Sequence, residues 1–209
     1  MKRLLLIRAT TDYSAEVVEH MKQICNLLGI EFVLYDYVNL DDFKAFATSE
    51  GSFDFLYLGA HGSHGCFGER CPPHTRWADF GLAICESAIL REGTVVFLGC
   101  CHGGLKRVAL ILFCNCPQIV TVCGPRWKVD QFDVALGLHT FLNNILIKME
   151  EPDCAAARTQ EATGRSFPIY NRFDHEAEVY ALTGELPEDY YYTADIEEDV
   201  VELSETEEA

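Results

Sequence analysis

Two apolar stretches of this chain end in side chains that could supply a nucleophile and its base. Residues 95–104, VVFLGCCHGG, run from an apolar segment into Cys100 and Cys101, and residues 55–62, FLYLGAHG, end in His61 and a glycine. A thiolate is a strong nucleophile, and a nearby imidazole or a helix N-terminus lowers the pKa of a thiol. Glycine-rich turns also leave backbone amides that could stabilise an oxyanion. From residue types alone, a buried cysteine and ordinary turn glycines explain the pattern equally well.

Short apolar strands that alternate with amphipathic helices must position these two ends. Strands are expected at residues 3–9, 31–37, 53–60, 94–99 and 118–124. Helices are expected at about 17–28, 40–48, 77–90, 104–113 and 134–145, with another beginning near 153. Nearly all-apolar strands of this kind predict an α/β fold, a three-layer α/β/α sandwich with a mostly parallel central sheet.

Chemistry in such sheets gathers beyond the carboxyl ends of the strands. His61 and Cys101 both follow strand ends, one after the strand at 53–60 and the other after the strand at 94–99. If these two strands are neighbours, the two side chains face the same crevice.

The negative charge is concentrated at the end of the chain. The net charge of the 209-residue chain is -17, and residues 185–209 contain eleven acidic residues and no Lys or Arg. We therefore predict one domain over residues 1–184 and a flexible acidic tail over residues 185–209. The sequence has no basic stripe that could follow a phosphate backbone, so nucleic acid is not an expected partner.

The ten cysteines are expected to be free, metal-bound or catalytic, and not paired in disulfides. The first residues, MKRLLLIRA, contain an apolar run too short for a secretory signal. No stretch has the roughly 18 uninterrupted apolar residues of a membrane span. A cytoplasmic protein in a reducing compartment, without membrane attachment, is the consistent prediction.

Three motifs, in order along the chain, resemble the caspase-like clan of cysteine peptidases, clan CD. The stretch GCCHGG is similar to the D-S-C-H-S-G pattern of metacaspases and to the A-C-x-(S/T)-G pattern of the CHAT branch. Residues 120–146 resemble the CHAT segment in which a strand leads to W-x-V-x-D and a long helix, with Asp130 one position early. Residues 150–162 are similar to the Ala-rich helix that follows it. The resemblance covers roughly residues 1–165 and implies a compact, stand-alone CHAT-type protease with a caspase-like fold.

The resemblance implies a role for each residue at the two strand ends. His61 would be the general base and acid, Cys101 the nucleophile, and the amides of Gly62 and Cys101 the oxyanion hole. Cys100 takes the place of the small residue before the nucleophile. The clan generally works as a Cys/His dyad, so no third acid and no cofactor are expected.

The substrate pocket is predicted to include Asp12, Gly99 and Cys100. Metacaspases have an aspartate two residues before the nucleophile that lines a pocket for basic residues, and this chain has Gly99 there. A preference for Arg or Lys is therefore in doubt. Asp12 could line such a pocket, although capping of the first helix is the simpler role for it.

The predicted function is that of a cysteine endopeptidase acting on a specific protein substrate, as in bacterial defence or regulated cell death. The repeat or sensor domains that accompany many CHAT domains are not expected in this sequence, which predicts regulation by a separate regulatory or activator protein or by the acidic tail. The alternative is a catalytically silent CHAT-like binding or scaffold module. A flavodoxin-like or nucleotide-binding domain is less favoured, because RATTDYSAE after the first strand is no Gly-rich phosphate loop.

Other cysteines and histidines have simpler explanations. The loop at 62–76 contains zinc-ligand residue types without a C-x-x-C knuckle, and a Cys-rich loop beside the substrate cleft is favoured over a metal site. Cys114 and Cys116 are expected to be core or interface thiols, and His102 and His139 to be structural. The zinc-ligand types in the loop are His64, Cys66, Cys71 and His74.

Overall fold

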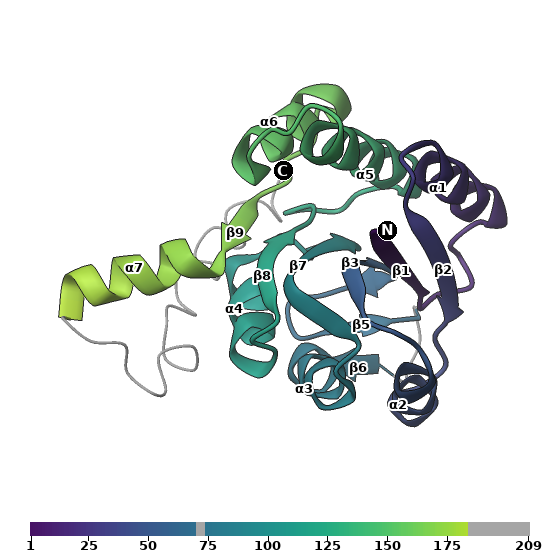
Figure 1. Cartoon of the computed structure of the whole chain (residues 1–209), viewed down its shortest axis with the longest axis horizontal. Helices are drawn as coiled ribbons and strands as arrows, with labels where there is room; N and C mark the ends of the chain where they lie inside the picture. Colours follow the sequence, from purple (N-terminus) through teal and green to yellow (C-terminus); the bar gives the residue numbers. More distant parts are fainter. Residues whose placement is uncertain (70–73, 184–209) are drawn as a thin grey trace, which may run out of the picture.

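A six-stranded sheet between two layers of helices forms the centre of the protein (Figure 1). The structure is a computed structural model that describes residues 1–69 and 74–183. The strand order is β2-β1-β3-β7-β8-β9, and every strand except β9 runs parallel to its neighbours. The strands are β1 (Arg3–Arg8), β2 (Glu31–Asp36), β3 (Phe53–Gly59), β7 (Leu90–Gly99), β8 (Ile119–Cys123) and β9 (Ile169–Asn171).

Helices cover both faces of this sheet, and each face has its own apolar core. The strands are apolar on both faces: along β3, Phe55 and Tyr57 pack into one core, and Leu56 and Leu58 pack into the other. The predicted three-layer sandwich with a mostly parallel sheet is confirmed. One layer contains α1 (Ala15–Leu27), α5 (Gln131–Leu146) and α6 (Pro152–Thr163), and the other contains α2 (Leu40–Ser49), α3 (Trp77–Ser87) and α4 (Lys106–Asn115).

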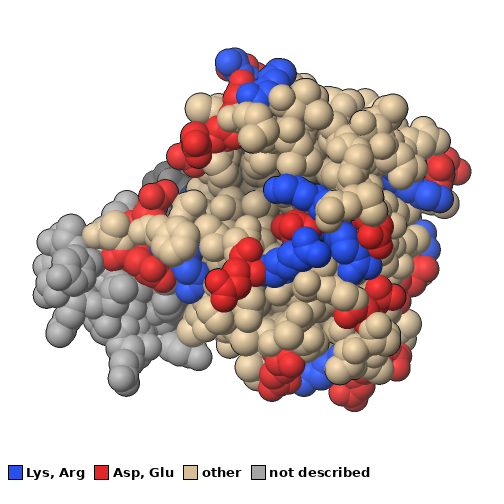
Figure 2. All heavy atoms as spheres, in the orientation of Figure 1, with Lys and Arg blue, Asp and Glu red and all other residues tan. Residues whose placement is uncertain are grey.

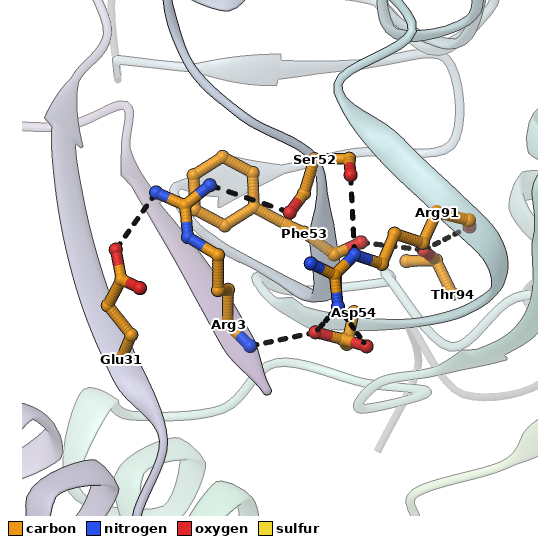
Figure 3. Close-up of polar contacts among 7 residues, drawn as sticks. All are labelled: Arg3, Glu31, Ser52, Phe53, Asp54, Arg91 and Thr94. Carbon is orange, nitrogen blue, oxygen red and sulfur yellow. Dashed lines mark hydrogen bonds and ion pairs between the residues drawn. The ribbon is translucent and has the colours of Figure 1, made fainter. Parts of the chain in front are cut away.

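Charged side chains fasten the amino-terminal ends of the strands (Figure 3). Asp54 on β3 accepts a hydrogen bond from the Arg3 backbone amide at 2.8 Å and pairs with the Arg91 guanidinium at 3.1 Å. The Arg3 side chain pairs with Glu31 on β2 at 2.9 Å. These contacts join the amino-terminal ends of four adjacent strands, β2, β1, β3 and β7. The carboxyl ends of these strands lie at the opposite edge of the sheet. On the face shown in Figure 2, basic and acidic side chains are interspersed.

The stretch expected to be a plain loop, residues 62–76, contains parts of a small second sheet. Three short antiparallel strands pair in the order β4-β5-β6 beyond the end of β3. Strands of two or three residues are too short for a recognisable alternation of apolar and polar residues. They are β4 (His61–Gly62), β5 (Cys66–Gly68) and β6 (His74–Arg76).

Two elements at the end of the described chain were not expected, namely β9 and α7 (Arg172–Thr183). Arg172, the first residue of α7, is buried against the end of α4 and the start of β8. Its guanidinium donates to the carbonyl oxygens of Cys116 and Ile119 at 3.0 Å each, and also to that of Phe113. A cation at a helix C-terminus stabilises the unpaired carbonyls of the last turn.

The predicted acidic tail, residues 185–209, lies outside the described residues. Among the helices of residues 1–69 and 74–183, none has the length and apolar character needed to cross a membrane.

Candidate active site

His61 and Cys101 lie at the same edge of the main sheet. Strands β3 and β7 are paired neighbours, and their last residues, Gly59 and Gly99, are directly opposite each other. His61 and Cys101 each follow two residues later. The strands before them are neighbours, as expected.

A cavity of about 230 Å³ lies between these strand ends, and both His61 and Cys101 line it. Its walls come from residues in four segments: the loop after β1, residues 60–61 after β3, residues 99–101 at the end of β7, and the start of α5. The three residues predicted for the substrate pocket, Asp12, Gly99 and Cys100, are all in this lining. Their roles in binding stay predictions.

The two adjacent thiols occupy different environments. Cys100 is 1% exposed, and burial raises the pKa of its thiol, with the neighbouring Cys101 as a second cause. A thiol held in the neutral form is a poor nucleophile. Cys101 is only half-buried, and its Sγ lies 3.8 Å from the carbonyl oxygen of Val129. Of the two thiols, Cys101 has the surroundings that suit a nucleophile.

Gly62 packs directly against the backbone of the cysteine turn. A Cβ atom at position 62 would lie 2.3 Å from the Cys101 carbonyl oxygen and 3.0 Å from the Cys100 Sγ. Only glycine lets β4 come this close to the turn. The two residues predicted to supply the oxyanion hole are therefore in direct contact through their backbones.

Asp12 contacts His61, which the sequence did not indicate. One carboxylate oxygen of Asp12, Oδ2, lies 2.9 Å from His61 Nε2. The simpler expectation for Asp12, capping of the first helix, is wrong: the cap of α1 is Ser14, whose hydroxyl accepts from the Val17 amide at 3.2 Å. The loop after β1 places Asp12 two residues before the cap, where its side chain reaches the neighbouring strand end.

The packing of Tyr57 explains why position 99 is a glycine, where the metacaspase pattern has an aspartate. A Cβ at position 99 would lie 2.1 Å from the Tyr57 hydroxyl oxygen and 2.3 Å from Cζ. Tyr57 is fully buried and its hydroxyl is hydrogen-bonded to that of Tyr13, which lines the cavity. The space that a side chain at 99 would need is filled by the Tyr57 phenol.

A second hollow of about 240 Å³ lies on the other side of His61 and includes Cys66, Glu69 and His74 in its lining. His61 lines both hollows.

His102, beside Cys101, has a backbone φ of 61°, which is uncommon for a residue other than glycine. Its ring meets that of His64 edge to face, 5.1 Å away. Burial, followed by the nearby His64, lowers the pKa of His102. This neutral imidazole packs in the turn, in keeping with the structural role expected for it.

The remaining cysteines and histidines show no metal centre in the described part of the chain. No group of three or more His, Cys, Asp or Glu side chains could hold an ion among residues 1–69 and 74–183, and Cys71 lies outside these ranges. Cys116 is buried, and burial raises its thiol pKa to about 12. Cys114 is half-buried on α4, and the ring of His139 on α5 meets that of His20 on α1.

Solved structures share this arrangement of strands and helices. One is the X-ray structure of an inactive zymogen of a C11 protease from Parabacteroides distasonis, with a TM-score of 0.61 and 10% sequence identity. The match covers 94% of this chain and 70% of that chain. No protein-family model matches the sequence, and no curated protein does. The likeness concerns the fold: this chain has a mixed α/β fold, with a mostly parallel sheet between helices, consistent with the caspase-like fold of that neighbour.

Proposed function

We propose that this chain is a cysteine endopeptidase of the CHAT type, with Cys101 as nucleophile and His61 as general base and acid. One observation carries the proposal. On a caspase-like fold, a half-buried cysteine and a histidine from two paired strand ends line the same cavity. Perturbed or exposed nucleophiles beside an imidazole in a cleft are typical of covalent catalysis.

The reaction divides among the groups of the site. His61 accepts the thiol proton, the Cys101 sulfur attacks the substrate carbonyl carbon, and the amides of Gly62 and Cys101 bind the oxyanion. The tetrahedral adduct then expels the amine, which takes its proton from His61. Water, deprotonated by His61, hydrolyses the thioester and restores the thiol. The close approach of Gly62 to the Cys101 carbonyl brings the two residues next to each other, as this pairing requires.

The substrate would lie across the carboxyl edge of the sheet, with His61 between the two hollows. Tyr57 blocks the aspartate position that metacaspases use for basic residues. The carboxylates that line the first cavity are Asp12 and Asp130, which come from other segments.

The wider biology belongs to the same proposal. The enzyme would cleave a specific protein in the cytoplasm, as in bacterial defence or regulated cell death, under the control of a separate activator or inhibitor. These elements derive from the resemblance to CHAT proteases described above.

A peptide library tests the proposal. Wild type, Cys101→Ala, His61→Ala and Cys100→Ala are incubated with diverse peptides and with a peptidyl acyloxymethyl ketone, and products and adducts are read by mass spectrometry. Cleavage and labelling should be present in wild type and Cys100→Ala, and absent in Cys101→Ala. Equal behaviour of wild type and Cys101→Ala would refute the assignment, and a complete lack of labelling and cleavage would favour the silent binding module.

A further inference from the structure

The carboxylate of Asp12 contacts the Nε2 nitrogen of the His61 ring. Asp12 Oδ2 lies 2.9 Å from His61 Nε2. An ionised carboxylate can only accept hydrogen bonds, so the proton of the neutral imidazole belongs on Nε2. Nδ1 then has a free lone pair and is the nitrogen able to accept a thiol proton. A single contact at Asp12 thus determines both the tautomer and the orientation of the ring.

We propose, on the basis of the cysteine-protease function above, that Asp12 is a positioning residue that fixes His61 in the Nε2–H tautomer, and that Glu69 and Gln131 hold the loop that carries Asp12. The site then works as a Cys–His–Asp arrangement in place of a simple dyad. The side chains of His61 and Asp12 are 35% and 49% exposed, so the pair adds little to stability. Its effect is on the orientation and the tautomer of the ring.

Glu69 holds this loop from the side of the small sheet. Its carboxylate accepts from the Thr11 amide at 2.5 Å and from the Thr10 hydroxyl at 3.1 Å. The Thr10 hydroxyl oxygen in turn accepts from the Asp12 amide at 3.2 Å. The hydrogen bond from the Thr11 amide is the first cause that lowers the pKa of Glu69, which keeps the carboxylate ionised as an acceptor. Glu69 follows β5 directly, so the small sheet that begins with His61 also positions the partner of His61.

Gln131 holds the same loop from the opposite side. This first residue of α5 donates from Nε2 to the Asp12 carbonyl oxygen at 3.3 Å, and its Oε1 accepts from the Ser14 amide at 2.9 Å. Two anchors from different elements therefore fix the backbone on both sides of Asp12. A carboxylate that only attracts a mobile, charged substrate side chain does not need such fixation, whereas one that orients a ring does.

The matched control is Asp130→Asn. Asp130 lines the same cavity, and its carboxylate caps α5 by accepting from the Asp133 amide at 2.9 Å. Asparagine caps helices as well as aspartate does, so this variant removes one negative charge from the cavity and keeps the fold. Asp12→Asn removes the same charge from the residue that contacts the imidazole.

Two readouts test the proposal without a known substrate. Long-range ¹H–¹⁵N NMR of histidine-labelled protein at neutral pH reports the tautomer of His61, assigned by the signal lost in His61→Gln. The rate at which iodoacetamide alkylates Cys101, measured by peptide mass spectrometry, reports how well the base activates the thiol. We expect the Nε2–H tautomer in wild type and Asp130→Asn, and a tautomer mixture in Asp12→Asn. Alkylation should slow by about 10- to 100-fold in Asp12→Asn and by less in Glu69→Ala.

The outcomes separate this inference from the proposed function. An Nδ1–H tautomer in wild type, or equal alkylation rates in Asp12→Asn and Asp130→Asn, would overturn the positioning role. With a cleaved peptide in hand, kcat should fall in Asp12→Asn with little change in KM. A loss confined to KM for peptides with a basic residue at the cleavage site would make Asp12 a substrate-binding group, against the proposal. If the tautomer depends on Asp12 and no peptide is cleaved, the protease function fails while the positioning stands.

Discussion

Replacing Gly99 with alanine should show that the Tyr57 ring fills the space that a side chain at position 99 would need. The new Cβ would lie 2.1 Å from the Tyr57 Oη and 2.3 Å from its Cζ, against a comfortable separation of about 3.5 Å. Tyr57 has nowhere to move: it is fully buried, stacked on Phe97 with ring centroids 5.9 Å apart, and hydrogen-bonded to Tyr13. Overpacking of a rigid core costs about 1–3 kcal/mol or more, and this overlap belongs at the upper end. For a chain of this size, about 3 kcal/mol lowers Tm by roughly 6–12 °C.

The assay is thermal and urea unfolding followed by circular dichroism, on a double-mutant cycle. Tyr57→Leu removes the ring that the new methyl group would strike, at a cost of about 2–4 kcal/mol for the smaller side chain. In that background Gly99→Ala should cost little, so the two changes are non-additive by at least about 1 kcal/mol. Gly65→Ala is the control, because a Cβ at Gly65 meets no atom within 4 Å. Equal costs of Gly99→Ala with tyrosine and with leucine at position 57 would refute the steric explanation.

Three further changes address other parts of the molecule. Arg172→Leu leaves the carbonyl oxygens of Cys116 and Ile119 without their charged donor. The free energy of unfolding in urea should therefore fall by about 3 kcal/mol, and a decrease below about 1 kcal/mol would contradict this explanation. The pKa of His102 is lowered in the folded protein, so on acidification the unfolded chain takes up this proton at a higher pH than the folded chain does. The contribution of His102 to the free energy of unfolding should therefore be fully present above about pH 6.5 and fall on acidification, by at most ~1.4 kcal/mol per pH unit. Melting curves from pH 7.5 to 5.5 should be flatter for His102→Asn, and an unchanged slope would exclude this residue. Gly62→Ala would displace the Cys101 carbonyl and should lower peptide cleavage by about 100-fold or more, with unaltered cleavage as the contrary result.

The layered fold could be predicted because its signals are long and repeated. Five apolar strands and the helices between them have clear periodicity, and their alternation leaves a parallel sheet as the consistent arrangement. The smaller elements gave no such signal. β4 has two residues, β5, β6 and β9 have three each, and they form only because neighbouring backbone is available to pair with.

The candidate site could be predicted as far as the two strand ends, since any residue directly after a parallel strand lies at the same edge. The contact between Asp12 and His61 could not. These residues are 49 positions apart, and the contact depends on a loop fixed by Glu69 and Gln131. The glycine at position 99 is another example. From the sequence alone it is only a difference from the aspartate of the metacaspase pattern, and the packing of Tyr57 explains it.

The adjacent thiols illustrate how a strand end selects one reactive group from two identical ones. The alternation of side chains along β7 puts Leu98 and then Cys100 into one core, and the chain turns at Cys101. Burial then raises the pKa of Cys100, while Cys101 is only half-buried at the start of the turn. Gly62 allows the histidine strand to come against this turn without a Cβ between them. The difference in reactivity between the two thiols thus depends on their position relative to β7, which buries Cys100 and leaves Cys101 at the turn.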